Sequence, residues 1–324
     1  MTFMKQLFIG LISATLMIGT MSSTAIAFEP DKPIEFIIMA GKGGGADKMA
    51  RLMQAIVEKE NLSNRPLFPT NKSGGSGAEA LIAAKNANDP DHTLMVTLNS
   101  FFTTPLRQPG LRIDNSTFAP IGRMAEDTFL LWVHKDSGVT TFAEYLTKAK
   151  ADGNKWVMGG TGRAGEDNII TNFLNNEFGL SMKYIPYQGG GEVAKQVAGK
   201  QLNSSVNNPS EALGFYESGD LVPLVAFTDE RLPLFPNVPT LKELGNDFSY
   251  FMQRAVVGAP GMSDDALAYY TDLFTKVYQS SDWQDYKNKQ SLMGEFMTGD
   301  ELRKYWDAQN SRHSVILKAS GDIK

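Results

Sequence analysis

The sequence has 324 residues, of which 42% are apolar and 21% charged, and it contains no cysteine. This composition is typical of a folded chain large enough for two domains, and it excludes disordered, collagenous and disulfide-stapled proteins. The formal charge of −5, with no basic cluster, argues against a nucleic-acid partner. The sequence has only three histidines, which are widely spaced, and no cysteine, so it lacks the usual zinc ligands and a thiol nucleophile. Among metal sites, only a carboxylate site for Mg²⁺ or Ca²⁺ stays open.

The first 27 residues have the pattern of a cleaved secretory signal. Lys5 precedes an apolar run over residues 7–19, and Ala25-Ile26-Ala27 is a small-x-small cleavage site. The alternative, a membrane anchor, needs about 20 apolar residues, and this run is shorter and interrupted by hydroxyl side chains. We therefore expect an exported protein whose mature chain begins at Phe28.

Short apolar runs then alternate with segments in which apolar residues recur at helical spacing. Residues 34–39 are a near-continuous apolar run, which predicts a strand buried on both faces. A glycine-rich loop over residues 41–47 follows it and leads into a helix with apolar residues at i, i+3, i+4 and i+7. The unit continues with an edge strand containing two prolines (65–70), a second glycine loop (71–77), a helix (78–85) and a third strand (92–98) that ends at Asn99-Ser100.

The same order of elements recurs about 115 residues later. Its members are a strand (155–158), a glycine loop (159–165), a helix, a strand (182–186), a second glycine loop (187–191), a helix (192–198) and a strand (201–206) before the polar segment 207–211. Strands that alternate with helices form parallel sheets, and ligands gather at the carboxyl ends of such strands. We therefore predict two α/β halves with a cleft between their loops.

The remaining segments predict connections between the halves and a helical C-terminal third. Residues 129–133 and 221–227 read as strands, and the proline-rich segment 231–240 as an ordered loop. Thr141 with Glu144, and Thr298 with Glu301, match the capping-box pattern, and Ser263 is placed to cap a further helix.

Two glycine loops match part of a dinucleotide-binding fingerprint. Gly41-x-Gly43-x-x-Ala46 and Gly160-x-Gly162-x-x-Gly165 both lie between a predicted strand and a helix. An NAD site also needs an acidic residue at the end of the second strand, and those ends carry Asn71-Lys72 and Tyr187-Gln188 instead. What remains is backbone N–H groups at helix N-termini, which bind anions. The natural ligand of four such loops is a small carboxylate.

Several charged residues lie in or beside these loops. Lys42, Arg163 and Arg254 are the cations best placed to pair with a carboxylate, although Lys42 and Arg163 are equally well explained as surface charges. Four acidic residues at helix starts favour a capping role over ligand contact: Asp47, Glu166, Asp167 and Glu192.

Enzymatic motifs are absent. No serine lies in a G-x-S-x-G setting, no histidine is paired by a recognisable motif, and no close pair of carboxylates indicates general acid–base catalysis. We expect a binding protein without a cofactor. The alternatives are an exported enzyme acting on a small carboxylate and, more remotely, a nucleotide-binding oxidoreductase.

Seven segments in order resemble one known family. They are Pro30-Asp31-Lys32-Pro33-Ile34, Gly43-Gly44-x-x-Asp47-x-x-Ala50-Arg51, Asn71-x-x-Gly74-Gly75-x-Gly77, Gly160-Thr161-Gly162-x-x-x-Glu166-Asp167, Pro186-Tyr187-x-Gly189-Gly190-x-Glu192, Asn208-Pro209-Ser210-Glu211 and Pro236-x-Val238-Pro239-Thr240-x-x-Glu243. On these residues the mature chain resembles the substrate receptors of tripartite tricarboxylate transporters, the TctC or Bug family.

The resemblance implies a two-lobed periplasmic binding protein of type II-like α/β fold, each lobe a mostly parallel sheet flanked by helices. Lobe 1 is expected to comprise residues 28–128 plus 252–324, and lobe 2 residues 129–251. The cleft would close on a di- or tricarboxylate, or another carboxylate, and deliver it to the membrane permease subunits. Lys42, Arg163 and Asn168 depart from the family's usual residues, which leaves the ligand open, and Phe101, Phe102 and Tyr187 keep aromatic acids among the candidates.

The resemblance, with the loop positions, gives the expected ligand-binding residues. In lobe 1 they are Lys42, Gly43, Gly44, Gly45, Ser73, Gly74, Gly75, Ser76, Gly77, Asn99, Ser100 and Arg254, and in lobe 2 Thr161, Gly162, Arg163, Gln188, Gly189 and Asn207. No metal site and no catalytic residue is expected. The default oligomeric state for this class is the monomer.

Overall fold

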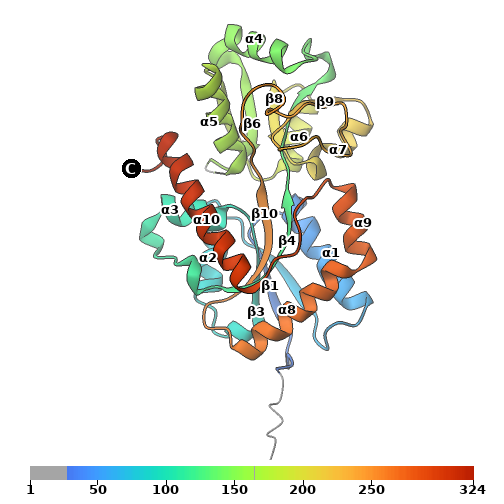
Figure 1. Ribbon diagram of the computed structural model, residues 1–324, viewed down its shortest axis with the longest axis vertical. Coiled ribbons are helices and arrows are strands. Elements are labelled where there is room, and N and C mark those ends of the chain that lie inside the picture. Colours follow the sequence, from blue (N-terminus) through green and yellow to red (C-terminus); the bar gives the residue numbers. More distant parts are fainter. Residues whose placement is uncertain (1–27, 164) are drawn as a thin grey trace, which may run out of the picture.

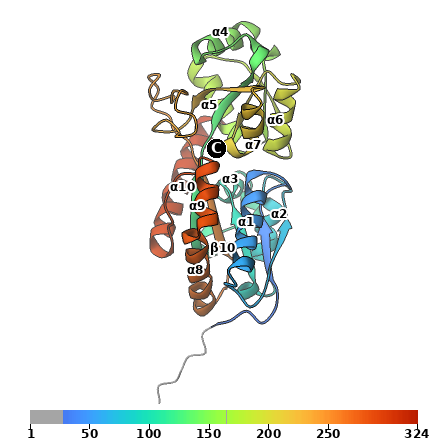
Figure 2. The same ribbon diagram turned by 90° about the vertical axis from the view of Figure 1, so that its right-hand side faces the viewer.

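The computed structural model describes residues 28–163 and 165–324, so the predicted signal sequence over residues 1–27 lies outside the described residues. The chain forms two lobes stacked along the long axis of the molecule, each built around one five-stranded sheet (Figures 1 and 2). Among the described residues, no helix has the length and apolar character needed to cross a membrane.

The first lobe contains the sheet with strand order β2-β1-β3-β10-β4. Strands β2, β1 and β3 are parallel, whereas β10 runs antiparallel to both of its neighbours. The proline-containing strand β2 lies at the edge, as its sequence predicts. The strands are β1 (Ile34–Ile38), β2 (Leu67–Asn71), β3 (Thr93–Thr97), β4 (Ala119–Asp127) and β10 (Met252–Gly258).

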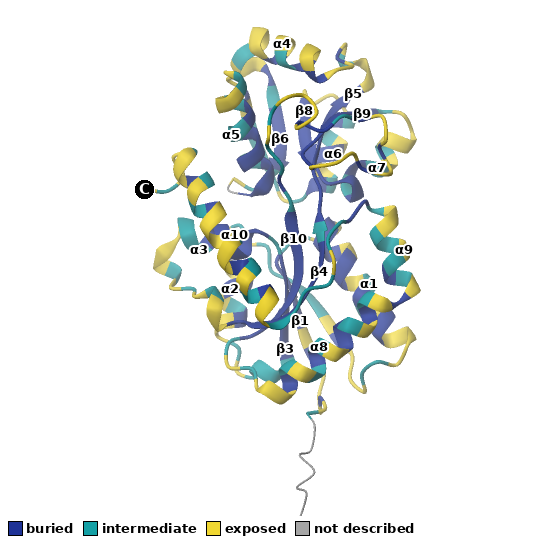
Figure 3. Ribbon diagram, in the orientation of Figure 1, coloured by how far each residue is buried: buried dark blue, intermediate teal, exposed yellow. Residues whose placement is uncertain are grey.

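Both faces of this sheet are covered by helices, which explains the unbroken apolar run of β1. Phe36 and Ile38 pack in the core under one helical layer, whereas Ile37 and Met39 belong to the core under the other. The first layer comprises α1 (Gly45–Lys59), α8 (Asp264–Gln279) and α9 (Ser281–Lys289), and the second α2 (Ala78–Lys85), α3 (Ser100–Arg107) and α10 (Gly299–Ala319). The helices expose their outer faces (Figure 3).

The second lobe repeats this arrangement with strand order β7-β6-β8-β5-β9. Its strands are β5 (Leu130–His134), β6 (Val157–Thr161), β7 (Lys183–Tyr187), β8 (Ser204–Asn207) and β9 (Leu221–Ala226). Helices α4 (Phe142–Asp152) and α5 (Glu166–Phe178) cover one face, and α6 (Gly190–Ala198) and α7 (Pro209–Glu217) cover the other. The repeat predicted from the sequence is therefore confirmed, with one antiparallel strand in each mostly parallel sheet.

Two segments cross between the lobes, and each supplies the antiparallel strand of the sheet that it enters. The first runs from β4 through Thr128 and Phe129 into β5, and the second runs from β9 through the irregular residues 227–251 into β10 (Figure 1). Helix α10 also touches both lobes, because Trp306 belongs to a first-lobe core cluster and Leu317 to a second-lobe one. The lobe boundaries given above stay a prediction.

Two of the three predicted helix caps are present in the structure. The capping box of Thr141 and Glu144 and the cap by Ser263 are confirmed. The capping box at Thr298 is wrong: its side chain makes no cap and instead donates a hydrogen bond to the Ile121 oxygen at 2.8 Å, which ties α10 to β4. The sequence did not reveal strands β4 and β10, nor helices α3 and α7.

Candidate functional site

A cavity of about 450 Å³ lies between the lobes, where the carboxyl ends of the parallel strands face each other. Loops after β1, β2 and β3 line it from the first lobe, and loops after β6, β7 and β8 line it from the second. This is the position at which open α/β sheets bind their ligands, and the volume is that of a small-molecule site.

Four helices that begin at this cavity have a glycine as the N-cap residue and therefore no side-chain cap. The N-cap residues of α1, α2, α5 and α6 are Gly44, Gly77, Gly165 and Gly189, and all four glycines line the cavity. Of the helices that begin away from it, α4, α8 and α9 are capped by Thr141, Ser263 and Ser280, whereas α10 has no side-chain cap. A helix start without a side-chain cap presents N–H groups and a partial positive charge. The cavity is therefore arranged to receive an anion.

The loop before α2 has a strained backbone. Gly75, Ser76 and Gly77 follow one another with φ values of 61°, 57° and 91°, and Ser76 has a side chain in a conformation that favours glycine. The Thr104 hydroxyl donates a hydrogen bond to the Ser76 oxygen at 2.6 Å and so supports this loop from α3. A Cβ on Gly77 would lie 2.8 Å from Cγ of Met39, so this position has no room for a larger residue.

Most of the predicted site residues line the cavity. They are Gly44, Gly45, Ser73, Gly74, Gly75, Ser76, Gly77, Ser100, Thr161, Gly162, Arg163, Gln188, Gly189 and Arg254. Lys42, Gly43, Asn99 and Asn207 are not among the lining residues. Lys42 and Gly43 are exposed on the loop between β1 and α1. Of the aromatic candidates, Tyr187 lines the cavity, whereas Phe101 and Phe102 are fully buried in the first-lobe core.

Asn99 and Asn207, which do not line the cavity, make hydrogen bonds within the protein. Asn99 Nδ2 donates to the Phe251 oxygen at 2.7 Å, and its Oδ1 accepts the Gln253 N–H at 3.0 Å, which attaches the end of β3 to the second crossing segment. Asn207 Nδ2 donates to the Gly190 oxygen at 2.9 Å and to Glu211 Oε2 at 3.1 Å. Both amides follow a strand, as a binding residue would, but tertiary partners hold the Asn99 amide and the nitrogen of the Asn207 amide. Oδ1 of Asn207 has no hydrogen-bond partner among the described residues.

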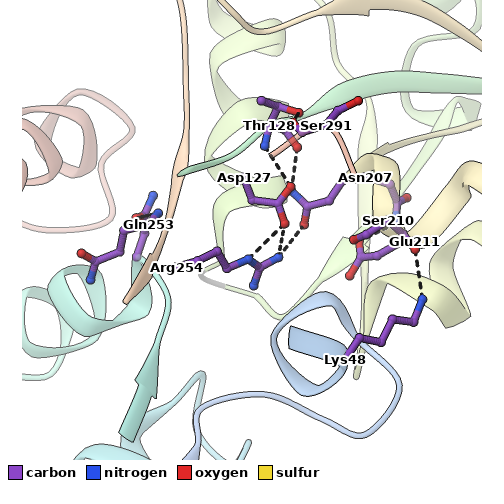
Figure 4. Close-up of polar contacts among 11 residues, drawn as sticks. Lys48, Asp127, Thr128, Asn207, Ser210, Glu211, Gln253, Arg254 and Ser291 are labelled. Carbon is purple, nitrogen blue, oxygen red and sulfur yellow. Dashed lines mark hydrogen bonds and ion pairs between the residues drawn. The ribbon is translucent and has the colours of Figure 1, made fainter. Parts of the chain in front are cut away.

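Arg254 is the buried cation of the site. It lies on β10, its Nε donates to Asp127 Oδ2 at 3.0 Å, and its Nη2 also pairs with that carboxylate (Figure 4). Burial lowers the pKa of Arg254, but the Asp127 carboxylate raises it, and the pKa stays above its ordinary value. The guanidinium thus keeps its charge beside the cavity while it joins the two crossing segments.

Three carboxyl groups also line the cavity, all from the second lobe: Glu166, Asp167 and Glu211. Asp167 Oδ2 accepts the Thr161 N–H at 2.6 Å, which matches the role of Asp47, whose Oδ2 accepts the Gly43 N–H at 2.9 Å in the first lobe. Burial raises the pKa of each of the three. The sequence indicated helix-start roles for Glu166 and Asp167, and it placed Glu211 in the polar segment 207–211 at the cleft without assigning it to the site.

The lobes touch across the cleft. Lys48 Nζ, on α1, donates a hydrogen bond to the Ser210 oxygen at 3.0 Å (Figure 4). The Glu166 carboxylate lies close to the backbone N–H of Asn99, which lowers its pKa against the effect of burial. None of the three histidines lines the cavity.

Comparison with known proteins places this geometry in a family. The family model described as "Tripartite tricarboxylate transporter family receptor" matches residues 50–321. A protein of Cupriavidus necator, named UPF0065 protein in gbd 5'region, is 24% identical over 322 residues, which are 97% of this chain and 96% of that protein.

Solved structures show the same fold. The periplasmic binding protein BugD matches with a TM-score of 0.84 at 18% identity, over 91% of this chain and 99% of that one. A Rhodopseudomonas palustris protein, Rpa4515 with adipate, has a TM-score of 0.83 at 20% identity, over 90% of this chain and 98% of that one. At these identities the likeness establishes the two-lobed α/β fold.

Proposed function

Because the chain belongs to the tripartite tricarboxylate transporter receptor family, we propose that it is a periplasmic solute-binding protein. It captures a small organic acid between its lobes and delivers the acid to the membrane subunits of such a transporter. Residues 1–27 serve as its export signal, it works as a monomer, and it needs no cofactor. Lobe 1, residues 28–128 plus 252–324, and lobe 2, residues 129–251, close on the ligand.

The observation that carries this proposal is the set of four glycine N-caps at one cavity. Each helix start offers backbone N–H groups to an anion, and a hydrogen bond to a charged group contributes about 1.5–3 kcal/mol. Several such bonds are enough to offset the cost of bringing the lobes together. The strained loop at Ser76 and the nearby Arg254 are suited to hold the carboxylate on the first-lobe side.

The experiment is a thermal-shift screen of the mature protein against mono-, di-, tri-, aromatic and amino carboxylates. A ligand that binds only the folded state stabilises it by about 2.7 kcal/mol at a hundredfold excess over Kd. We expect one chemical subset to raise the melting temperature by several degrees. A folded, ligand-free protein that responds to no carboxylate contradicts the proposal.

A matched pair of variants locates the site. A Cβ on Gly189 or Gly110 meets no atom within 4 Å, but only Gly189 lines the cavity. Gly189→Leu is expected to abolish the ligand response by filling space that the ligand needs, and Gly110→Leu is expected to leave it intact. Equal responses in both variants would place the ligand elsewhere.

One observation favours the alternative, an exported enzyme acting on a carboxylate: three carboxyl groups line the cavity. The family nevertheless consists of receptors, and no histidine accompanies those groups in the cavity. Incubation of the identified ligand with the protein, followed by NMR, tests the alternative. The receptor proposal expects the ligand to be recovered unchanged.

A further inference from the structure

A second cavity, of about 380 Å³, lies in the first lobe and shares no lining residue with the cavity between the lobes. One wall is the face of α10 that carries Trp306 and Asn310. The other wall is formed by the end of α3 and by residues 113–116 of the loop that leads to β4. Helices α3 and α10 pack against each other beside this loop (Figure 1). The proposed function makes no use of this cavity.

Hydrogen bonds hold the walls of the second cavity in place. Nδ2 of Asn115 donates to the Phe101 oxygen at 2.7 Å, which joins the loop to α3. Nη1 of Arg303 donates to the Ser116 oxygen at 2.9 Å, which joins the loop to α10. Within the loop, Asp114 accepts the Ser116 N–H at 3.0 Å. The cavity is therefore preformed, as small-molecule sites usually are.

Two buried polar atoms of these walls lack partners, and they are of opposite kinds. Trp306 is only 3% exposed, and its Nε1, a donor, has no hydrogen-bond partner among the described residues. Oδ1 of Asn115, an acceptor, is likewise buried and unpartnered within the part of the chain that the structure describes. The Asn115 amide cannot turn over without releasing the Phe101 oxygen. Because a buried polar group without a partner is costly, the two atoms indicate that something in the cavity bonds to them.

The rest of the wall is partly apolar. Pro105, Leu106 and Ile113, all half-buried, line the cavity together with Trp306. Ordered water would satisfy the two polar atoms but would leave these apolar groups wet, and removing apolar surface from water is favourable. The walls therefore fit a ligand with an apolar body and two polar atoms, an acceptor for the indole N–H and a donor for the asparagine oxygen.

The charged lining residues do not require a charged ligand. Asp114 and Asp307 are exposed, and Arg303 is half-buried and already bonded to the Ser116 oxygen. Because both signs are present and reach solvent, none of these groups offers the desolvated counter-charge that a buried ion needs. An amide group carries an acceptor and a donor side by side without any charge.

We propose that the second cavity binds an uncharged amide, whose oxygen accepts the Trp306 N–H and whose own N–H donates to Oδ1 of Asn115. The amide belongs to a small apolar molecule or to a short peptide segment, and the volume is within the range of small-molecule sites. The site is independent of the acid that binds between the lobes.

The test is titration of the mature protein with three probes of matched shape. 4-Methylpentanamide carries both polar atoms, 5-methylhexan-2-one has a methyl group in place of the amide nitrogen, and 4-methylpentan-1-amine lacks the oxygen. We expect the amide to bind at least fivefold more tightly than either of the other two. Calorimetry gives this ranking on the wild-type protein without any variant.

The indole signals in a proton–nitrogen NMR spectrum locate the binding. The signal of Trp306 is the one lost in Trp306→Phe, and the amide is expected to shift it saturably. Trp283 is the internal control, because its Nε1 is also buried and unpartnered but the residue does not line this cavity. Its signal is expected to stay in place.

A pair of variants on α10 confirms the position. Asn310 is exposed and lines the cavity, so the larger ring in Asn310→Phe is expected to fill the space and abolish amide binding. Ala308→Phe is the matched control, because Ala308 is exposed on the same helix but does not line the cavity. Amide binding that survives Asn310→Phe overturns the inference.

The remaining outcomes are equally decisive. Equal binding of the three probes is expected of an apolar hollow filled by solvent and overturns the inference, as does a Trp306 signal that does not respond to the amide up to its solubility limit. N-acetyl-leucine amide distinguishes the sources of the amide. Binding tenfold tighter than that of 4-methylpentanamide supports a peptide segment, and equal or weaker binding supports a small molecule.

Discussion

Arg254 and Asp127 form a buried ion pair between the two segments that cross from lobe to lobe, with Nε of Arg254 3.0 Å from Oδ2 of Asp127. Arg254 is 3% exposed and Asp127 1%. Nη2 of Arg254 also lies 3.5 Å from Oδ1 of Asn208 in the second lobe. One guanidinium thus contacts both crossing strands, the second lobe and the ligand cavity.

Removal of one member of this pair is expected to destabilise the protein strongly. Asp127→Asn leaves a buried guanidinium without its counter-charge, which costs about 3–5 kcal/mol. Urea denaturation measures the loss. The control is Asp136→Asn, because the pair of Asp136 with Lys200 is more than half exposed at both side chains and contributes about 0–1 kcal/mol. A loss below 1 kcal/mol for Asp127→Asn would contradict the structural role of the pair.

The contact between Lys48 and the Ser210 oxygen joins the lobes directly. Lys48→Met is expected to lower the affinity for the bound acid between twofold and tenfold, since a hydrogen bond is worth about 0.5–1.5 kcal/mol. Isothermal titration calorimetry measures the change. Lys59→Met is the matched control, because Lys59 pairs with Asp282 inside the first lobe, at 2.6 Å. Equal affinities for the two variants would show that the bond does not contribute to closure.

Asn99 is expected to matter for stability. Asn99→Ala leaves the Gln253 N–H and the Phe251 oxygen without their partner, and each buried unsatisfied group costs about 1–3 kcal/mol. In chemical denaturation, the midpoint of unfolding should therefore lie at a clearly lower denaturant concentration than that of wild type. Asn246→Ala, which removes an exposed hydrogen bond to Glu177, should change the midpoint of unfolding little. A stable Asn99→Ala protein that has lost only ligand affinity would restore the original assignment of Asn99 to ligand binding.

The buried side chain of His313 is expected to make the stability of the protein depend on pH. Burial lowers the pKa of His313 to about 4 from its ordinary value of 6.5, and the ring contacts the Tyr250 hydroxyl at 2.9 Å and the Gln309 oxygen at 2.7 Å. Between these pH values the unfolded chain binds a proton that the folded chain does not. The free energy of unfolding therefore falls as the pH drops from 6.5 to 4, by roughly 3 kcal/mol in all.

His313→Gln removes this contribution. Its free energy of unfolding, measured by urea denaturation, should decline less steeply than that of wild type between pH 6.5 and 4. Above pH 7 the two proteins should show parallel pH dependence, because the group is neutral in both states there. An unchanged slope in the acidic window would show that His313 titrates normally in the folded protein.

The elements that the sequence revealed are those whose packing is local and regular. In α8 the apolar residues recur at helical spacing, and in β1 they are nearly continuous, so each element is recognisable from its own residues. The glycine loops mark the turns between strands and helices. Strand β10 was not predicted because its residues Gln253 and Arg254 interrupt the apolar pattern. Both are buried by partners more than 100 residues away in the chain, Asp127 and Thr97.

By itself the sequence determined the repeated α/β unit, the glycine N-caps and hence a site for an anion, because each depends on spacing within a few residues. Tertiary structure alone decided which polar groups face that site. Asn99 and Asn207 turned to buried backbone partners, while Glu166, Asp167 and Glu211, from the starts of two helices, came together on one wall. The partner of each of these side chains is set by contacts between separate elements of the chain, and those contacts form only in the folded tertiary structure.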